Sequence, residues 1–423
     1  MHEDLQFNIA GGLGFELPQM VRVRQLFERH GIDDVAKAIT GELARPEIKA
    51  KVKPGAKIAV GVGSRGVANI DVAVRALIGA LKAQGADPFI FPAMGSHAGG
   101  TAEAQAALLA GYGVTESTMG APVRATMDTI MVTELDDGTA IHMDRFAHEA
   151  DGVVLINRVK PHTSFRGPVE SGVIKMMIIG MGKINGATAI HGGHPMADFG
   201  EVLPRAAGAL MKHIPFLFGV GMVEDAHDDT AIVEALPAET LLLREPELQA
   251  RAKELMARIY IDDIDVLVID EIGKEISGAG CDPNVTGYKN SPGFELPRVK
   301  KMVILDVTDA TKGNATGIGS ADVITHRLLS RVDFAATYAN TVTSTYLEGA
   351  RIPIPMKTGR DAVRLAVKTL IAVQPENARI VRIRNTLKLE EIEVSAPLLE
   401  EVRHEDRMEI LSEPSKVVFS DAA

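Results

Sequence analysis

The sequence predicts an α/β protein with two domains, each a mostly parallel sheet flanked by helices. Segments typical of helices and strands alternate through much of the chain, which is the pattern of this class. The chain has 423 residues, too many for one small core, so two domains are the natural expectation. Its composition, 46% hydrophobic and 24% charged, is that of an ordinary globular protein.

The first elements follow the strand–helix–strand order of a parallel sheet. Residues 57–60, a lysine followed by three apolar residues, predict a buried strand. Residues 71–84 have helical spacing, and residues 88–91 predict a second strand. A loop with His97 follows, and Thr101 is placed to cap the next helix. Because ligand sites in such sheets form where loops leave the carboxyl ends of strands, the His97 loop is a candidate site segment.

A third strand is predicted over residues 152–156, and it leads directly into Pro161 and His162. His162 therefore also follows a strand, and we expect it at the same edge of the sheet as His97. The proline before it gives the imidazole a stiff backbone support.

A helix predicted over residues 245–259 connects to the second half of the chain. We place a domain boundary near residue 255, which divides the chain into domains 1–255 and 256–423. We expect the second domain to close a cleft over the first, with the active site in that cleft. Its predicted elements are a strand at 266–270, a strand at 303–307 and a helix at 361–373.

Charge and cysteine content exclude several classes of protein. The net charge of −11 argues against general nucleic-acid binding, and an anionic substrate would need a local basic pocket. The single cysteine, Cys281, excludes a disulfide within the chain and an all-cysteine zinc site. It fits a reducing compartment, so we expect a cytoplasmic protein. The oligomeric state is left open, a homo-oligomer included.

We expect neither a signal peptide nor a membrane span. Residues 1–20 show no basic start followed by a long apolar run. The most apolar stretch, residues 173–181, is interrupted by Lys175 and Gly180 and is far shorter than the roughly 20 residues that a span requires.

Three histidines and a lysine gather in the middle of the chain: His162, Lys175, His191 and His194. All lie in sequence punctuated by glycine or proline, as His97 does upstream, and we expect them outside the middle of helices. Histidine changes charge near neutral pH and is the commonest protein ligand for metals. A lysine in an apolar run can be desolvated and nucleophilic. Together they predict a proton-transfer centre built around a metal or a bound cofactor.

Each of these residues also has a purely structural interpretation. His97 and His162 could be ordinary loop histidines, and Lys175 could extend its amine to solvent along an apolar surface. His191 and His194 form H-G-G-H, which we interpret as flexible glycine sequence rather than a helical metal motif. Either histidine could be a metal ligand, and the sequence does not favour one over the other.

The glycines Gly61, Gly63 and Gly66 match G-x-G-x-x-G between a predicted strand and a predicted helix. The match is partial, because Asp87 precedes the next strand instead of ending it. The alternative is a tight turn in which Arg65 offers a forked donor to an anion. A nicotinamide-dinucleotide-dependent oxidoreductase is therefore kept as an alternative function.

In their order, these motifs resemble the lactate racemase family, whose enzymes use a nickel-pincer nucleotide. The resemblance is clearest over residues 57–195, and no single motif in it is specific. The residues that carry it are Arg65, Gly95-Ser96-His97, His162, Ser171-Gly172-x-x-Lys175 and His191.

The resemblance implies a cofactor, nickel pyridinium-3,5-bisthiocarboxylic acid mononucleotide, whose ring binds nickel through one carbon and two sulfurs. It implies that Lys175 joins this cofactor covalently through a thioamide and that His191 is the protein ligand to nickel. Ser171 and Gly172, which precede the lysine in the motif, are assigned to cofactor binding, and Arg65 to cofactor or substrate.

The resemblance further implies an isomerase, a racemase or epimerase of a small 2-hydroxy acid. The hydrogen on C2 is too weakly acidic for ordinary abstraction, but hydride transfer to and from the electron-poor cofactor avoids a carbanion. His97 and His162 then act as general acid and base on opposite faces. Lys274, at the end of a second-domain strand, is our candidate for a further substrate contact.

Two positions differ from the family pattern, since Val62 stands where an aspartate is usual and Val173 interrupts the usual glycine pair. Malate or a sugar acid is therefore as plausible a substrate as lactate. Besides the oxidoreductase, a non-catalytic protein that binds a hydroxy acid or the cofactor remains an alternative.

Overall fold

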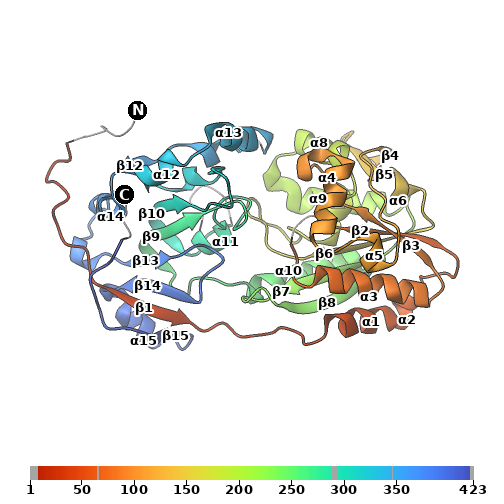
Figure 1. Ribbon diagram of the computed structural model, residues 1–423, viewed down its shortest axis with the longest axis horizontal. Helices are drawn as coiled ribbons and strands as arrows, with labels where there is room; N and C mark the ends of the chain where they lie inside the picture. The colour runs from red at the N-terminus through yellow and green to blue at the C-terminus, as the bar shows by residue number, and fades with distance from the viewer. Residues whose placement is uncertain (1–7, 64–65, 288–292, 345, 420–423) are drawn as a thin grey trace. The chain divides into compact units, whose positions relative to one another are not determined.

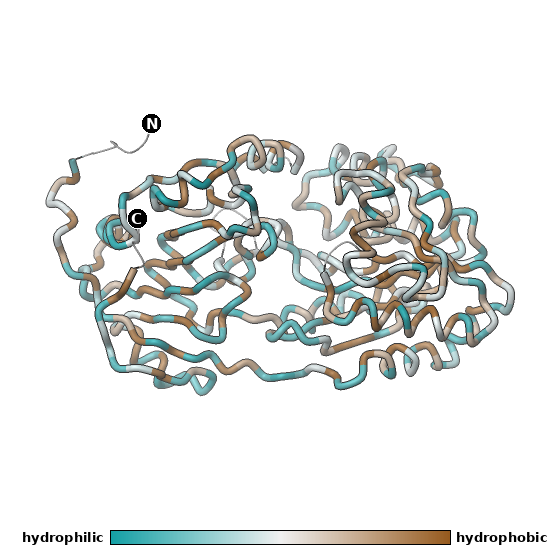
Figure 2. The backbone as a smooth tube through the Cα atoms, in the orientation of Figure 1, coloured by the Kyte–Doolittle hydropathy of each residue, from teal (hydrophilic) through white to brown (hydrophobic). Residues whose placement is uncertain are grey.

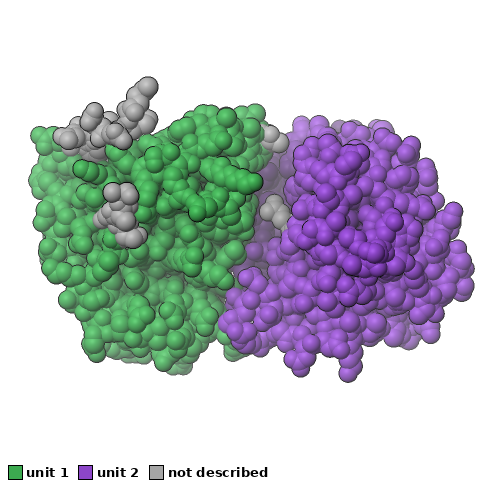
Figure 3. Space-filling model, in the orientation of Figure 1, with its two compact units in different colours: residues 1–28, 257–423 green, residues 29–256 purple. Residues whose placement is uncertain are grey.

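The computed structural model describes residues 8–63, 66–287, 293–344 and 346–419. The chain forms two compact units, coloured separately in Figure 3. One unit is the continuous segment Arg29–Met256, and the other joins Met1–Glu28 to Ala257–Ala423. Both are α/β, with mostly parallel sheets flanked by helices, as the sequence predicted.

The unit 29–256 contains a five-stranded sheet in the order β3-β2-β6-β7-β8 among its described residues. Neighbouring strands are parallel from β3 to β7, and β8 is antiparallel to β7. The strands are β2 (Lys57–Val62), β3 (Asp87–Pro92), β6 (Gly152–Arg158), β7 (Phe216–Glu224) and β8 (Thr230–Pro237). The antiparallel pair β4 (Thr129–Glu134) and β5 (Ala140–Asp144) forms a separate hairpin.

Helices connect these strands and cover the sheet (Figure 1). They are α1 (Val35–Ala44), α2 (Pro46–Lys49), α3 (Ile70–Ala83), η1 (Ala98–Gly100), α4 (Ala102–Gly111), α5 (Glu116–Met119), α6 (Arg145–His148), α7 (Val173–Lys175), η2 (Met176–Gly180, a π-helix), α8 (Lys183–Gly193), η3 (Met196–Asp198), α9 (Phe199–Leu210) and α10 (Leu241–Leu255).

Both faces of this sheet are buried, as is typical of a parallel sheet. Along β6, Val153 and Leu155 enter a core shared with α7, η2, α9 and α10, whereas Val154 and Ile156 enter a core shared with α1 and α3. All four side chains are fully buried, and each such burial contributes about 1.5–3 kcal/mol. Brown, hydrophobic stretches accordingly mark much of this unit in Figure 2.

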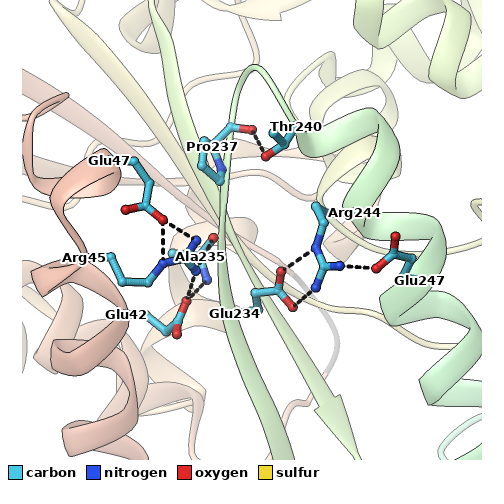
Figure 4. A network of polar contacts seen from close by, with 9 residues as sticks. All are labelled: Glu42, Arg45, Glu47, Glu234, Ala235, Pro237, Thr240, Arg244 and Glu247. Atoms are coloured by element: carbon cyan, nitrogen blue, oxygen red, sulfur yellow. Dashed lines mark hydrogen bonds and ion pairs between the residues drawn. The ribbon is translucent and has the colours of Figure 1, made fainter.

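A polar network ties helices to the outer strand β8 (Figure 4). Arg45, between α1 and α2, binds Glu42 and donates to the carbonyl of Ala235 in β8 at 3.2 Å. Arg244, near the start of α10, forms a forked contact with Glu234 of β8, at 3.1 and 3.3 Å. This pair links the start of α10 to the sheet, although ion pairs with an exposed partner contribute little stability.

The second unit contains an eight-stranded mixed sheet, in the order β12-β11-β10-β9-β13-β14-β1-β15 among its described residues. The strands from β12 to β13 are parallel, and β14, β1 and β15 continue the sheet in antiparallel pairs. They are β1 (Met20–Gln25), β9 (Asp263–Ile272), β10 (Arg298–Val307), β11 (Val323–Thr325), β12 (Ile354–Met356), β13 (Ile380–Ile383), β14 (Glu391–Ser395) and β15 (Met408–Ile410).

Short helices pack around this second sheet. They are α11 (Pro283–Thr286), η4 (Ile318–Ser320), α12 (His326–Ser330), α13 (Phe334–Thr343), η5 (Leu347–Ala350), α14 (Gly359–Lys368), η6 (Pro375–Asn377), η7 (Ala396–Leu398) and α15 (Leu399–His404).

The domain limits differ from the expectation at the N-terminal end. The sequence assigned residues 1–255 to one domain, but the structure groups Met1–Glu28 with Ala257–Ala423. The physical reason is strand pairing, since β1 hydrogen-bonds to β14 on one side and to β15 on the other. Local sequence does not reveal such a pairing, because its partners lie more than 350 residues away.

Two predicted helices are shifted. The helix expected over 245–259 is α10, which begins at Leu241, and the one expected over 361–373 is α14, which ends at Lys368. Within the part of the chain that the structure describes, no helix on its own has the length and apolarity to cross a membrane. The bent helix pair Val173–Gly180 and Lys183–Gly193, with 102° between its halves, matches a membrane span in combined length and in composition only.

Candidate active site

The loop that leaves β6 is built around a buried carboxylate, Glu170, whose side chain is fully buried. Its oxygens accept the backbone N–H groups of His162 at 2.8 Å and Gly167 at 3.2 Å. Arg166 and Lys253 form ion pairs with it at 3.2 and 2.6 Å. Because a buried carboxylate needs such partners, Glu170 and the backbone at His162 fix each other's position.

Helix α10 supports the same segment through three polar residues, Glu245, Gln249 and Lys253. We call them the α10 stripe, since residues four apart lie on one face of a helix. Lys253 pairs with Glu170, and Oε1 of Gln249 accepts the N–H of Ser171 at 3.5 Å. The stripe thereby holds the chain from the His162 loop to the start of α7.

The side chain of Glu245 binds the first backbone N–H groups of α7, as the side chain of a capping residue would. Its fully buried carboxyl group accepts the N–H of Val173 at 2.9 Å and the N–H of Ile174 at 3.1 Å. Burial raises the pKa of Glu245 to about 8, although the two backbone donors lower it. Gly172 is required here, because its φ is +153° and a Cβ would lie 2.6 Å from Oε1 of Glu245.

Val173, which interrupts the glycine pair usual in the family that the sequence resembles, is accommodated by a compensating glycine. The Val173 side chain is fully buried against β7. A Cβ at Gly219 in that strand would collide with it. The valine therefore fits without displacing the turn that begins α7.

Three of the predicted site residues meet around two phenylalanines, Phe165 and Phe199, which we call the phenylalanine pair. Their ring centroids are 5.7 Å apart. The His162 ring lies 4.4 Å from Phe165 and the His191 ring lies 4.9 Å from Phe199, both between centroids. Nζ of Lys175 is 5.7 Å from the centroid of Phe165. Segments from β6, α7 and α8 thus bring two imidazoles and an amine to one place.

The positive charge of Lys175 acts on the neighbouring imidazole of His191. Although His191 is exposed at one side, burial of the ring against protein atoms lowers its pKa, and the positive charge of Lys175 lowers it further. A lowered pKa keeps this imidazole neutral at neutral pH, which is the form that binds metals.

In His162, Nδ1 accepts the N–H of Ser164 at 3.1 Å, so a neutral ring carries its proton on Nε2.

The structure separates the two histidines of H-G-G-H. The expectation of flexible glycine sequence is wrong, because His191 lies in the last turn of α8 and His194 follows it as the C-cap. Nε2 of His194 contacts Oγ1 of Thr139 at 2.9 Å and lies 3.8 Å from Asp137, at the β4–β5 turn. Of these two histidines, His191 is the one that lies against the phenylalanine pair.

The exposed His97 begins η1, and the loop around it lies against the same helical segments. The N–H of Gly95 donates to the carbonyl of Gly180 in η2 at 2.9 Å. A Cβ at Gly100 would lie 2.7 Å from Cδ1 of Ile184 in α8. The loop is therefore anchored on η2, which follows Lys175, and on α8, which bears His191.

Arg65 lies outside the described residues, so its predicted role is not tested here. In the glycine motif beside it, Gly61 has a packing reason, because a Cβ would lie 2.5 Å from Leu155 and 2.8 Å from Phe91. A phosphate-binding role is not needed to explain that glycine. Lys274 belongs to the other unit and donates to the carbonyl of Gly278 at 2.6 Å.

Sequence reasoning missed the residues that hold the site, chiefly Glu170 and the α10 stripe. The four-residue spacing of Glu245, Gln249 and Lys253 was a signal that could have been used. It was ambiguous, because such spacing usually marks a solvated helix face. Glu170 gave no comparable signal, since its partners come from separate segments.

Among the residues that the structure describes, no group of three or more histidine, cysteine, aspartate or glutamate side chains is arranged to hold a metal ion. The only cysteine of the chain, Cys281, is buried in the other unit, and burial raises its pKa to about 12.

No family model matches the chain, and no curated protein matches it. Among solved structures, the lactate racemase apoprotein from Thermoanaerobacterium thermosaccharolyticum matches 86% of this chain and 94% of its own, with a TM-score of 0.54 and 14% identity. The two proteins share a fold. At that identity the likeness extends to the fold alone, and the activity of this chain has to be argued from its own residues.

Proposed function

We propose that this protein is an isomerase that inverts C2 of a small 2-hydroxy acid, with a nickel-pincer nucleotide held at Lys175 and His191. The observation that carries the proposal is the meeting of His162, Lys175 and His191 around the phenylalanine pair. The motif order in the sequence and the shared fold with a lactate racemase apoprotein support it.

The residues present fit such a cofactor. A pincer ring brings its own carbon and sulfur donors to nickel, so one imidazole from the protein completes the set, and sulfur and imidazole ligands both suit this metal. This agrees with a site in which the described residues offer His191 but no cluster of protein ligands. Lys175 is half-buried near His191 and would supply the amine for covalent attachment.

When bound, the cofactor would supply an electron-poor ring that takes up the C2 hydrogen with its electron pair and returns it. The chain's own residues would handle the proton of the hydroxyl group. His162 and His97 are assigned as acid and base, a contribution of about 10²–10⁴-fold. The hydrogen bond from the Ser164 N–H to Nδ1 of His162 leaves Nε2 as the atom that exchanges a proton with substrate.

The substrate class is a hydroxy acid with a single carboxylate or a larger anion such as malate or a sugar acid. In a protein with a net charge of −11, the anion needs local positive charge. In this proposal Lys175 is covalently bound to the cofactor and does not supply this charge. Arg65 and Lys274 are assigned to substrate binding.

The test is isotope-resolved racemisation by protein that carries its cofactor, taken from the native source or from a host that makes the cofactor. A panel of 2-hydroxy acids labelled with deuterium at C2 is screened for inversion. We expect a primary isotope effect and retention of the label at C2, because a hydrogen held by the cofactor would not exchange with water.

His97→Ala and His162→Ala should each lower kcat by about 10²-fold or more while the mass on Lys175 is kept. His213→Ala, an exposed histidine after α9, is the matched control and should turn over normally. Wild-type turnover in both site variants would contradict the acid–base assignment. Reversible dinucleotide binding without metal would favour the oxidoreductase, and ligand binding without turnover would favour the non-catalytic protein.

A further inference from the structure

A fully buried lysine, Lys183, lies where the helical segments that bear Lys175 and His191 meet. It is the first residue of α8, at the 102° bend between Val173–Gly180 and Lys183–Gly193. Its backbone is in the left-handed region, with φ of +53°. Neither the fold nor the proposed chemistry assigns a function to this amine.

The ammonium group of Lys183 binds three other segments. It pairs with Oδ2 of Asp144, at the end of β5, at 3.1 Å, and hydrogen-bonds to the carbonyl of Pro92, at the end of β3. It also donates to Oε1 of Gln105 in α4 at 3.4 Å. Burial lowers the pKa of Lys183 and raises the pKa of Asp144, and the attraction between them opposes both shifts.

Gln105 carries this contact on to the His97 loop. Its side chain is fully buried, and Nε2 donates to the carbonyl of Gly95 at 2.9 Å and to the carbonyl of His97 at 3.2 Å. A single chain of hydrogen bonds therefore runs from the bend before α8, through Gln105, to the backbone of His97.

Stability alone does not explain this arrangement. Replacing a buried ion pair with apolar side chains of similar volume is often neutral or stabilising, because desolvation of two charges offsets their attraction. A buried network of paired polar groups does favour one defined geometry. The geometry at stake here is the position of His97 relative to the helices that bear Lys175 and His191.

We propose that Lys183 and Gln105 are positioning residues that fix the His97 loop on the helical segments of the candidate site. The proposal rests on the proposed function only for the catalytic consequence, because the effect on the loop is a property of the protein without cofactor. Neither side chain is assigned a contact with substrate.

The first test is Gln105→Met, which nearly keeps the volume and leaves no unpaired buried carboxylate. The matched control is Leu109→Met, one turn further along the buried face of the same helix. Hydrogen–deuterium exchange of peptides covering residues 94–100 is measured in the cofactor-free protein. We expect exchange to be about 3–10-fold faster in Gln105→Met and unchanged in Leu109→Met, as loss of hydrogen bonds to the loop predicts.

A second variant removes the ion pair without leaving one charge alone. Lys183→Met with Asp144→Asn is neutral at both positions, and the asparagine can still accept the N–H of Ala147 that caps α6. It should show the same faster exchange over residues 94–100. Unchanged exchange in both variants, relative to Leu109→Met, would overturn the proposal.

Kinetics of the cofactor-loaded protein separate positioning from the proposed function. We expect both variants to lower kcat by about 10–100-fold with little change in KM and with the mass on Lys175 kept, since a small misplacement of a catalytic group costs rate more than binding. Loss of cofactor loading equal to the loss of rate would contradict a positioning role. Faster loop exchange in a protein whose wild type turns over no hydroxy acid would support positioning and reject the proposed function.

Discussion

At the scale of single residues, buried carboxyl groups organise the site. Glu170 fixes the backbone at His162, and Glu245 binds the first N–H groups of the helix that bears Lys175. They differ in their partners, because Glu170 has two cationic side chains within ion-pair distance, whereas Glu245 accepts hydrogen bonds from backbone donors. Burial therefore raises the pKa of Glu245 to about 8.

This raised pKa predicts a pH-dependent contribution to stability. Between its ordinary value of 4.5 and about 8, the folded protein keeps the proton on Glu245 and the unfolded chain releases it. The unfolded state then binds fewer protons, so stability falls as pH rises through this window, by up to about 1.4 kcal/mol per pH unit. Glu245→Gln cannot ionise and should flatten that part of the decline.

The measurement is the free energy of urea unfolding as a function of pH across the same window. Glu247→Gln, an exposed neighbour on the same helix, is the matched control and should follow the wild type. An identical pH dependence in Glu245→Gln and wild type would show that the Glu245 carboxyl is not held protonated in the folded state.

At the scale of elements, the sequence predicted strands better than the site's helices. Short runs of four or five mostly apolar residues marked β2, β3 and β6 because both faces of the sheet are buried. The helix α8 was missed because Gly192 and Gly193 lower helix propensity, yet packing of the buried Ile190 and Ala187 keeps the last turn helical. His191 is therefore held by a helix and was expected in a flexible loop.

The turn before α7 gives a prediction at this scale. Gly172→Ala should cost about 2 kcal/mol or more, because φ at this position suits glycine and the new Cβ would meet the Glu245 carboxyl. Gly192→Ala is the matched control in α8, where a Cβ meets nothing within 4 Å, and alanine there should be neutral or stabilising by about 0.5–1 kcal/mol. Equal unfolding midpoints for the two variants would contradict the described turn.

At the scale of the whole molecule, the sequence predicted the fold class and the number of units, but it did not predict which unit the N-terminal segment joins. Alternating helix and strand patterns predicted two α/β units, which the structure has. The place of β1 depends on pairing with β14 and β15, and that information is spread over the length of the chain. Closure of one unit over the other and the cytoplasmic location stay predictions.

The division into units predicts which fragment folds alone. Residues 29–256 form one continuous segment with two buried cores of its own, so this fragment should unfold cooperatively when expressed separately. Residues 257–423 lack β1, which pairs with both β14 and β15, and should need residues 8–28 for cooperative unfolding. Thermal unfolding followed by circular dichroism tests both fragments. A fragment 29–256 without a cooperative transition would contradict the division.

The central claim is that Lys175 and His191 belong to one site that holds a nickel-bearing cofactor, and peptide-resolved mass with nickel content tests it most directly. Protein from a source that makes the cofactor should carry added covalent mass on Lys175 and about one nickel per chain. His191→Ala should keep the mass and lose nickel, and Lys175→Ala should lose both. Nickel and added mass that persist in both variants would contradict the account.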